Sequence, residues 1–140
     1  MLTKDEIKAL VKKKGWRFNW SGELKISERD VYKLTIANNP DIIQGIISLE
    51  VKADHVFVHF IESAPFNIGK SKTYLGVPGN LIAFACKLSF QRGGEGYVSF
   101  FSKTKLLGHY EKSLGAICAG GQLMVITTET ALKLTNKNFK

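Results

Sequence analysis

Two groups of residues in this chain have types and spacing that could do chemistry. The first is the turn Gly76–Gly79, which follows a predicted apolar strand and opens a predicted helix. A glycine-bearing turn in that position can present backbone N–H groups to a phosphate. The second is Tyr110, which lies on the next helix but one and could stand beside a reaction centre. Together they suggest a cofactor site and an acid in one chain segment.

The elements that would position these residues follow from the periodicity of the sequence. Residues 3–14 have the capping-box spacing and the apolar stripe of a helix, and the aromatic residues of 16–20 alternate as in a short strand. Alternation then predicts an antiparallel meander of three strands joined by short turns. These strands are residues 31–37, 42–51 and 55–61, and their turns are residues 38–41 and 52–54.

In the second half of the chain, predicted helices alternate with predicted strands. A polar loop over residues 63–72 leads to a predicted helix at 80–91, which Gly93–Gly96 ends. An apolar strand follows at 97–101. Since strand, helix and strand in succession form a βαβ unit, strands 55–61 and 97–101 should be parallel. The remaining predicted elements are a helix at 105–114, a strand at 122–127 and a helix from about residue 128.

This element order predicts an α/β (α+β) fold, with a mixed, mostly antiparallel sheet whose central parallel strand pair is flanked by helices. At 140 residues and 44% hydrophobic, the chain is expected to form one domain over residues 1–140. No run approaches the roughly 18 apolar residues that suggest a membrane span, and the N-terminus lacks the layout of a secretory signal. We therefore expect a cytoplasmic protein without a membrane partner.

The net charge and the cysteines indicate which classes of partner the chain could bind. The net charge of +8 favours anionic partners, but it does not distinguish nucleic acid from a membrane surface or a polyphosphate cofactor. Lysines crowd the two ends of the chain, at 4, 8, 12, 13 and 14 and at 133, 137 and 140. Most of these are expected to lie on solvated helix faces, so a nucleic-acid role is disfavoured. Cys86 and Cys118 lack CxxC spacing and are expected to be buried thiols. His55, His59 and His109 lack metal-ligand spacing, so no metal is expected.

These parts, in this order, resemble the GNAT N-acetyltransferase superfamily over roughly residues 30–135. The stretch Gly76–Ile82 resembles the family's acetyl-CoA turn, Gln/Arg-x-x-Gly-x-Gly/Ala, with the helix that follows it. The stretch Tyr110–Ala116 resembles Tyr-Glu-Lys-Leu-Gly-Phe with one extra residue. Two positions depart: Thr73 stands where the family usually has Gln or Arg, and Pro78 where it has the second Gly or Ala. A proline there removes one N–H but suits the first turn of a helix.

The resemblance implies transfer of an acetyl group from acetyl-CoA to an amine by direct attack in a ternary complex. Tyr110 would donate a proton to the departing CoA thiolate, and Glu62, which closes its strand, would deprotonate the amine. Acetyl-CoA would insert where the two parallel strands splay apart. The positions that the family implies for binding it are the backbone after Glu62, the amides of the turn and a lysine near the family's usual Asn: Ser63, Ala64, Pro65, Gly76, Val77, Gly79, Asn80 and Lys103.

Ordinary interpretations of the same residues stand beside these. Without the family, Tyr110 would be a core tyrosine and Glu62 a solvated strand-end glutamate, although a bulge just before Glu62 would change the face it occupies. The acceptor is an unknown amine. About thirty residues precede the meander, so we expect an acceptor pocket that is reduced, or completed by the second subunit of a homodimer. The aromatic residues of 16–20 either line that pocket or cover the sheet.

Two other classes of function remain open. A catalytically degenerate CoA-binding module would explain the departures in the turn and the short N-terminal region. A nucleic-acid-binding domain would use the basic ends together with the aromatic strands, because stacking and phosphate neutralisation support sequence-tolerant binding.

Overall fold

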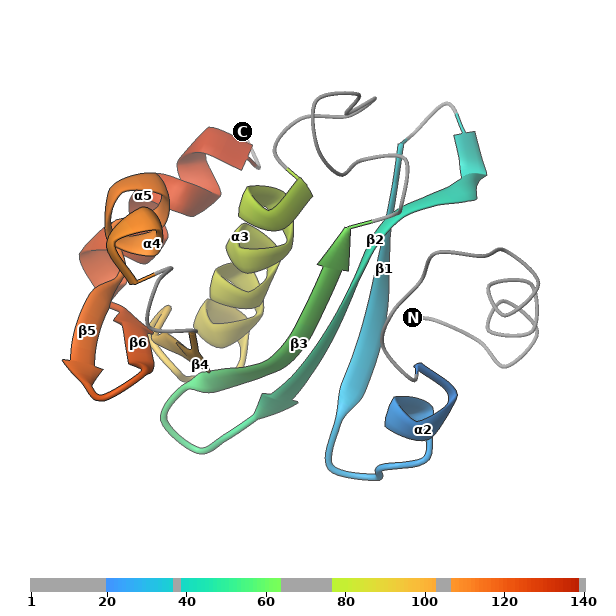
Figure 1. Cartoon of the computed structure of the whole chain (residues 1–140), viewed down its shortest axis with the longest axis horizontal. Coiled ribbons are helices and arrows are strands. Elements are labelled where there is room, and N and C mark those ends of the chain that lie inside the picture. Colours follow the sequence, from blue (N-terminus) through green and yellow to red (C-terminus); the bar gives the residue numbers. More distant parts are fainter. Residues whose placement is uncertain (1–19, 37–38, 64–76, 103–106, 139–140) are drawn as a thin grey trace.

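The computed structural model describes residues 20–36, 39–63, 77–102 and 107–138. Within these residues, six strands form one sheet in the order β1-β2-β3-β4-β6-β5 (Figure 1). The strands are β1 (Asp30–Ile36), β2 (Asn39–Val51), β3 (Val56–Ser63), β4 (Val98–Phe101), β5 (Ile117–Gly120) and β6 (Leu123–Ile126). The helices are α2 (Trp20–Leu24), α3 (Val77–Gln91), α4 (Leu107–Leu114) and α5 (Thr128–Asn138).

Strand pairing confirms the predicted mixed sheet. β1, β2 and β3 are antiparallel neighbours, as expected of a meander. β3 and β4 are parallel, with Val56 opposite Val98 and Val58 opposite Phe100. The connection between them is α3, and a strand–helix–strand crossover of this kind gives parallel strands. β6 is antiparallel to both β4 and β5, so the α/β (α+β) class and its central parallel pair are confirmed.

The expected strand at residues 16–20 is wrong at its end, because Trp20 begins the helix α2. Period-two alternation of aromatic residues suggested a strand, whereas tertiary contacts of the Trp20 and Glu23 side chains hold this short segment as one helical turn. Residues 16–19 lie outside the described residues, as does the helix expected at 3–14.

Three boundaries also differ from the predictions. β5 (Ile117–Gly120) was not predicted, and all four of its residues are exposed, so it has no buried face to produce a periodic signal. α3 begins at Val77, three residues before the predicted start, because Pro78 is compatible with the first turn of a helix. β2 begins at Asn39, so most of the expected turn at 38–41 is strand.

The face of the sheet covered by α3, which we call the α3 face, holds the large apolar core. Ile47 and Leu49 of β2, Val56 and Val58 of β3, and Leu81 of α3 belong to one cluster of buried side chains. α5 packs against α3, and Figure 1 shows these two helices side by side above the strands. Since each buried aliphatic side chain contributes about 1.5–3 kcal/mol, this face supplies most of the hydrophobic stabilisation.

The opposite face, which we call the α2 face, has a smaller apolar cluster. Its buried members are Trp20, Val31 and Ile46, and Figure 1 shows α2 beside β1, away from α3. Buried polar side chains also lie on this face, among them Ser48 and Glu62. The sheet is therefore covered by apolar packing on one side and by mixed polar and apolar packing on the other.

A β-bulge at His59 decides which residues of β3 lie on each face. Consecutive residues of β2 pair with Val58 and Phe60, so His59 is an extra residue in the ladder. Side chains alternate along a strand, and one extra residue reverses the alternation. Val58 therefore lies on the α3 face, whereas Phe60 and Glu62 lie on the α2 face.

The two parallel strands part after a short pairing. In the described residues, the β3–β4 ladder joins 56–58 to 98–100. β3 then continues to Ser63, whereas β4 ends at Phe101. β3 therefore extends beyond the described β3–β4 ladder. We call this end of the ladder the splay, after the site that the family resemblance implies.

The turn between α3 and β4 depends on glycine. Gly96 has a φ of +85°, and a Cβ placed there would lie 2.5 Å from a ring carbon of Phe90, so no other residue fits without a shift. The Ser89 hydroxyl donates a hydrogen bond of 2.9 Å to the carbonyl of Tyr97 across this turn. The predicted break at Gly93–Gly96 is confirmed, and it returns the chain into the sheet beside β3.

Candidate functional site

The candidate site lies where the ladder between β3 and β4 ends. In sheets with parallel strands, ligands bind outside the carboxyl ends of the strands. Glu62 and Ser63 close β3 at this point, and Ser102 follows β4, where its N–H donates to the carbonyl of Gln122 at 2.8 Å. The residues nearest this edge, on each face of the sheet, are therefore the candidate functional residues.

Glu62 is buried under Trp20. The carboxylate is 6% exposed and the tryptophan 3% exposed. The indole Nε1–H of Trp20 donates a hydrogen bond of 2.9 Å to Oε1 of Glu62. The interpretation of Glu62 as a solvated strand-end glutamate is therefore wrong, because the bulge at His59 turns it toward the α2 face, where α2 covers it.

The same helix makes a second polar contact with the sheet. Glu23 of α2 accepts a hydrogen bond of 2.7 Å from the hydroxyl of Ser48 on β2. Arg29 donates to both carboxylate oxygens of Glu23, at 2.7 and 2.9 Å. Both contacts come from the same nitrogen, Nη1, and hydrogen bonds between a guanidinium and a carboxylate are stronger than those between neutral groups. α2 is thus connected to β3 through Trp20 and to β2 through Glu23.

Tyr110 lies on the other side of the splay. Its half-buried ring packs edge-on against Phe100, with 5.4 Å between ring centres, and belongs to the same cluster as Leu114 on the α3 face. Tyr110 therefore packs as part of the core, as the ordinary interpretation expects. Glu62 and Tyr110 thus lie on opposite faces of the sheet.

The start of α3 is the element nearest to the expected phosphate site. Gly79 and Asn80 lie in its first turn and are half-buried, and a Cβ placed on Gly79 would meet no atom within 4 Å. The first N–H groups of a helix have no intrahelical acceptor, and Val77 and Gly79 supply two of them here, whereas Pro78 has none. The expected residues Ala64, Pro65, Thr73, Gly76 and Lys103 lie outside the described residues.

The histidines make local pairs. Nδ1 of His55 lies 2.6 Å from Oδ1 of Asp54, and Nε2 of His59 lies 3.0 Å from Oε1 of Glu50. Hydrogen bonds from His59 first, and then from Lys52, lower the pKa of the Glu50 carboxyl. In the part of the chain that the structure describes, no three His, Cys, Asp or Glu side chains are grouped so that they could hold a metal ion. The side chain of His109 is not among those described.

The two cysteines differ in their surroundings. Cys86 lies in the core on α3, and burial raises the pKa of its thiol to about 12. Cys118 on β5 is exposed, so the expectation of two buried thiols is wrong for it. The error has the same origin as the missed strand, since β5 is an edge strand with no buried face.

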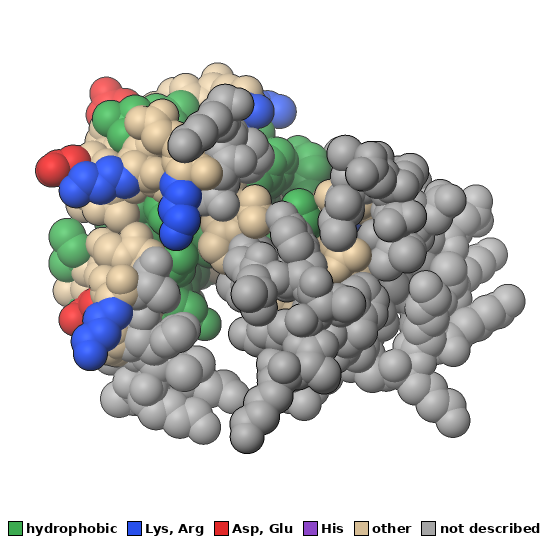
Figure 2. Space-filling model, turned by 90° about the horizontal axis from the view of Figure 1, so that it is seen from above, with side chains coloured by type: hydrophobic (Ala, Val, Ile, Leu, Met, Phe, Trp, Pro, Cys, Tyr) green, Lys and Arg blue, Asp and Glu red, His purple; other side chains and the backbone are tan. Residues whose placement is uncertain are grey.

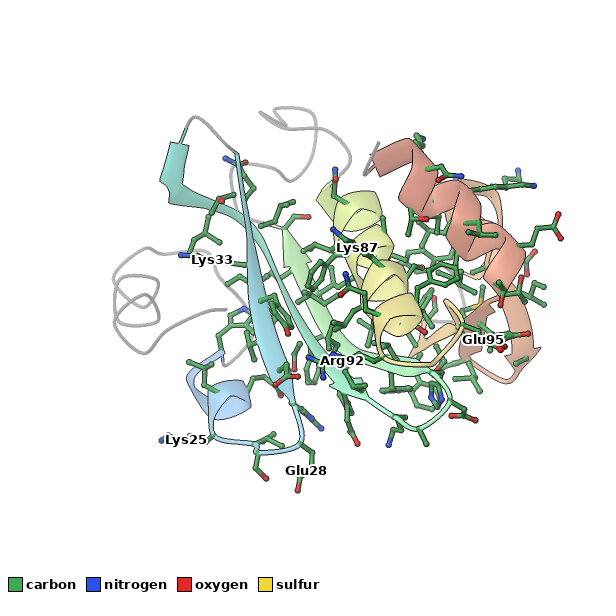
Figure 3. All side chains as sticks on the ribbon, turned by 180° about the vertical axis from the view of Figure 1, so that it is seen from behind. Lys25, Glu28, Lys33, Lys87, Arg92 and Glu95 are labelled. Atoms are coloured by element: carbon green, nitrogen blue, oxygen red, sulfur yellow. The ribbon has the colours of Figure 1, made fainter. Side chains whose placement is uncertain are left out.

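The positive charge of the chain lies mainly outside the described residues. Nine of the twenty lysines and arginines, but ten of the twelve acidic residues, lie within the described ranges. Figure 2 shows acidic and basic side chains intermingled on the described part of the surface in view. Figure 3 shows Lys87 on α3, and Arg92 and Glu95 in the turn that follows this helix. The excess positive charge therefore belongs to the terminal segments and the loops, among them 64–76 and 103–106.

A surface hollow of about 550 Å³ lies at the opposite end of the parallel strands. It is lined by residues at the start of β3 and β4, including His55, Tyr97 and Ser99, and by Leu123 and Val125 of β6. None of the residues expected to bind acetyl-CoA or to react with it lines this hollow, so it is distinct from the splay.

Sequence reasoning missed the role of Trp20. A buried indole N–H usually finds an acceptor, and a glutamate on a neighbouring element is a natural one. That general signal does not identify the acceptor, because Trp20 and Glu62 are 42 positions apart. Only the register of β3 and the position of α2 bring them together.

Comparison with known proteins places this geometry in a fold family. No protein-family model matches the sequence, and no curated protein matches it significantly. Among solved structures, GCN5 from Tetrahymena superposes with a TM-score of 0.54 at 12% identity, over 75% of this chain and 71% of GCN5. A chain of the KacTA–DNA complex superposes with a TM-score of 0.60 at 11% identity, over 96% of this chain and 86% of the other.

A third structure is a mutant of the AtaT toxin bound to the C-terminus of the antitoxin AtaR and to acetyl-CoA. It superposes with a TM-score of 0.45 at 14% identity, over 66% of this chain and 63% of AtaT. The argument for the fold therefore rests on the first two structures.

The fold is that of the GNAT acetyltransferases, and the resemblance seen in the sequence is confirmed at this level. The shared feature is a mixed sheet that contains a parallel strand pair and is flanked by helices. No helix in the described part of the chain has the length and apolar composition needed to cross a bilayer.

Proposed function

We propose that this protein is an N-acetyltransferase that transfers the acetyl group of acetyl-CoA to an amine by direct attack in a ternary complex. The observation that supports this most is the splay between β3 and β4, with Glu62 on one face of the sheet and Tyr110 on the other. A thioester held in the splay would have a base on the acceptor side and an acid on the side of the leaving thiolate.

The pyrophosphate of acetyl-CoA would bind at the first turn of α3. The amides of Val77, Gly79 and Asn80, with that of Gly76 before them, would donate to its oxygens, and the positive end of the helix dipole favours an anion there. The loops that follow the two parallel strands add Lys70, Lys72, Lys103 and Lys105 and contain no acidic residue. This charge would compensate for the N–H that Pro78 lacks.

The reaction would need two proton transfers. Glu62 would accept a proton from the amine, directly or through one water, as the nitrogen attacks the thioester carbonyl carbon. The new C–N bond forms and the C–S bond breaks, and the CoA thiolate takes a proton from the Tyr110 hydroxyl. A backbone N–H within Ser63–Pro65, alongside the pantetheine arm, would stabilise the negative charge on the carbonyl oxygen.

The acceptor amine would enter from the α2 face, because Glu62 lies on that face. Phe60 is 37% exposed there, and the guanidinium of Arg29 lies 5.9 Å from the centre of its ring. These groups would form one wall of a small acceptor pocket. A second copy of the chain is the alternative source for the remaining walls.

The proposed function is tested by binding and by turnover. Native mass spectrometry should show one acetyl-CoA bound per chain, and thiol release should rise when spermidine, a lysine-containing peptide or an aminoglycoside is added. The exposed thiol of Cys118 reacts with thiol reagents, so the assay should use the Cys118→Ser protein throughout. Absence of acetyl-CoA binding at near-millimolar concentration would contradict the proposal.

A second candidate is a CoA-binding protein without turnover, and the burial of Glu62 beneath Trp20 favours it. A buried carboxylate that accepts a hydrogen bond can simply anchor a helix. This candidate gives acetyl-CoA binding equal to that of an enzyme but no thiol release with any amine, so the same pair of measurements distinguishes the two.

A further inference from the structure

The contact between Trp20 and Glu62 constrains the carboxylate as well as covering it. An indole N–H can only donate a hydrogen bond, so its direction defines which carboxylate oxygen faces the tryptophan. Here that oxygen is Oε1, at 2.9 Å. Both side chains are at least nine-tenths buried, so little bulk water competes for this contact. The rotation of the carboxyl group of Glu62 is therefore coupled to the position of the Trp20 ring.

The position of Trp20 depends in turn on tertiary contacts. α2 has five residues, includes Gly22, and is too short to be stable by itself in water. Two side-chain hydrogen bonds to the sheet, Trp20 to Glu62 and Glu23 to Ser48, help to hold it, together with the apolar packing of Trp20. One helical turn therefore bridges β2 and β3 on the face from which the acceptor would enter.

The two contacts offer a natural comparison. Each is a buried hydrogen bond between α2 and the sheet in which a glutamate is the acceptor. They differ in which glutamate accepts the hydrogen bond. Ser48 donates to Glu23 of the helix, whereas Trp20 donates to Glu62 at the end of β3. If these contacts served only to anchor α2, removing either one would have the same effect on turnover.

We propose that Trp20 is a positioning residue for the reaction, which holds the Glu62 carboxylate in the orientation needed to accept the proton of the amine. This inference rests on the proposed function, because it requires that Glu62 act as the base. Trp20 itself would not touch the reacting atoms.

The test compares Trp20→Phe with Ser48→Ala in the Cys118→Ser protein. Trp20→Phe keeps an aromatic ring under the sheet and removes the N–H donor. We expect kcat for thiol release to fall about 10- to 100-fold, the range for losing a hydrogen bond to a charged group, with KM for acetyl-CoA unchanged. Ser48→Ala should leave kcat at its wild-type value.

A double variant separates positioning from a loss of folded structure. If Trp20 acts through Glu62, Trp20→Phe should cause no further loss of turnover in a Glu62→Gln background. The ¹⁵N-indole resonance assigned by its loss in Trp20→Phe should also shift in Glu62→Gln. Circular dichroism measures the folded fraction of each variant, and rates are compared per folded molecule.

The outcomes distinguish this inference from the function on which it rests. An active wild type with wild-type turnover in Trp20→Phe would overturn the positioning role and leave the acetyltransferase proposal intact. Equal losses in Trp20→Phe and Ser48→Ala would overturn it in favour of simple anchoring of α2. A wild type that binds acetyl-CoA without releasing thiol would overturn both.

Discussion

The α3 face and the α2 face of the sheet are built from the same strands but differ in what they bury. On the α3 face, the strands and α3 form a continuous apolar cluster around Ile47 and Val58. On the α2 face, the neighbouring positions bury Ser48 and Glu62 beside the smaller cluster of Ile46 and Trp20. Both faces extend to the end of the β3–β4 ladder.

This difference indicates a division of work between stability and chemistry. Burial of apolar area stabilises a fold in proportion to that area, whereas a buried carboxylate is stable only when it is hydrogen-bonded. The α2 face keeps such carboxylates and gives each a donor. A face that retains buried charge despite its desolvation cost is where perturbed, functional groups are expected.

The largest expected effect on the α2 face is that of Glu62→Gln. Glutamine keeps an oxygen that can accept from Trp20 but cannot take a proton from an amine. We expect thiol release to fall by about 10² to 10⁴, with acetyl-CoA affinity and thermal stability close to wild type. The measurement is steady-state turnover beside native mass spectrometry. Wild-type turnover in this variant would show that the α2 face does not supply the base.

The largest expected effect on the α3 face is on stability. Ile47→Ala should lower the free energy of unfolding by about 2–5 kcal/mol, because it leaves a cavity in the large cluster. Ile46→Ala is the matched variant, since Ile46 is its neighbour in β2, is also fully buried and faces α2. Ile46→Ala should lower the free energy of unfolding by less than Ile47→Ala, because the smaller cluster can relax around the cavity. Urea unfolding measures both, and equal losses would contradict the contrast.

Tyr110→Phe tests the chemical contribution of the α3 face. Phenylalanine keeps the edge-on contact with Phe100 and removes only the hydroxyl. We expect turnover to fall about tenfold, less than for Glu62→Gln, because a thiol of pKa about 8.5 leaves readily without full proton donation. Thermal denaturation controls for packing. A loss equal to that of Glu62→Gln would show that both faces contribute equally to chemistry.

The smallest expected effect concerns acid stability. Since the hydrogen bond from His59 lowers the pKa of Glu50, this carboxylate contributes stability that is present above its ordinary pKa of 4.5 and is lost as the pH falls through the lowered value. Glu50→Gln should therefore lose less stability than wild type between about pH 5 and about pH 3. Urea unfolding at both pH values measures this. The exposed Glu28→Gln makes the same charge change, and an identical response from it would refute the assignment to Glu50.

The sequence predicted the fold to a large extent because the relevant signals are local. Alternation in the meander, the helical stripe of 80–91 and the glycines of Gly93–Gly96 each act within a few residues, and all three were confirmed. β5 was missed because a short, exposed strand has neither periodicity nor a buried face. The helical start at Trp20 was missed because contacts with distant strands outweighed local alternation.

The candidate site was less predictable for a related reason. The sequence identified Glu62 and Tyr110 through the order of motifs, but not the surroundings of either side chain. Whether Glu62 is solvated or buried depends on the face it occupies. That face is set by one extra residue, His59, in the pairing with β2.

The sequence alone determined the antiparallel meander, the parallel pair, and a strand-end carboxylate with a tyrosine two helices later. The reason is that propensity, periodicity and crossover handedness act through the chain itself. The opposition of Glu62 and Tyr110 across the splay and the indole over Glu62 were decided only by the tertiary structure. The physical reason is that strand register and the docking of a five-residue helix are non-local, so residues 42 positions apart meet only after the sheet has formed.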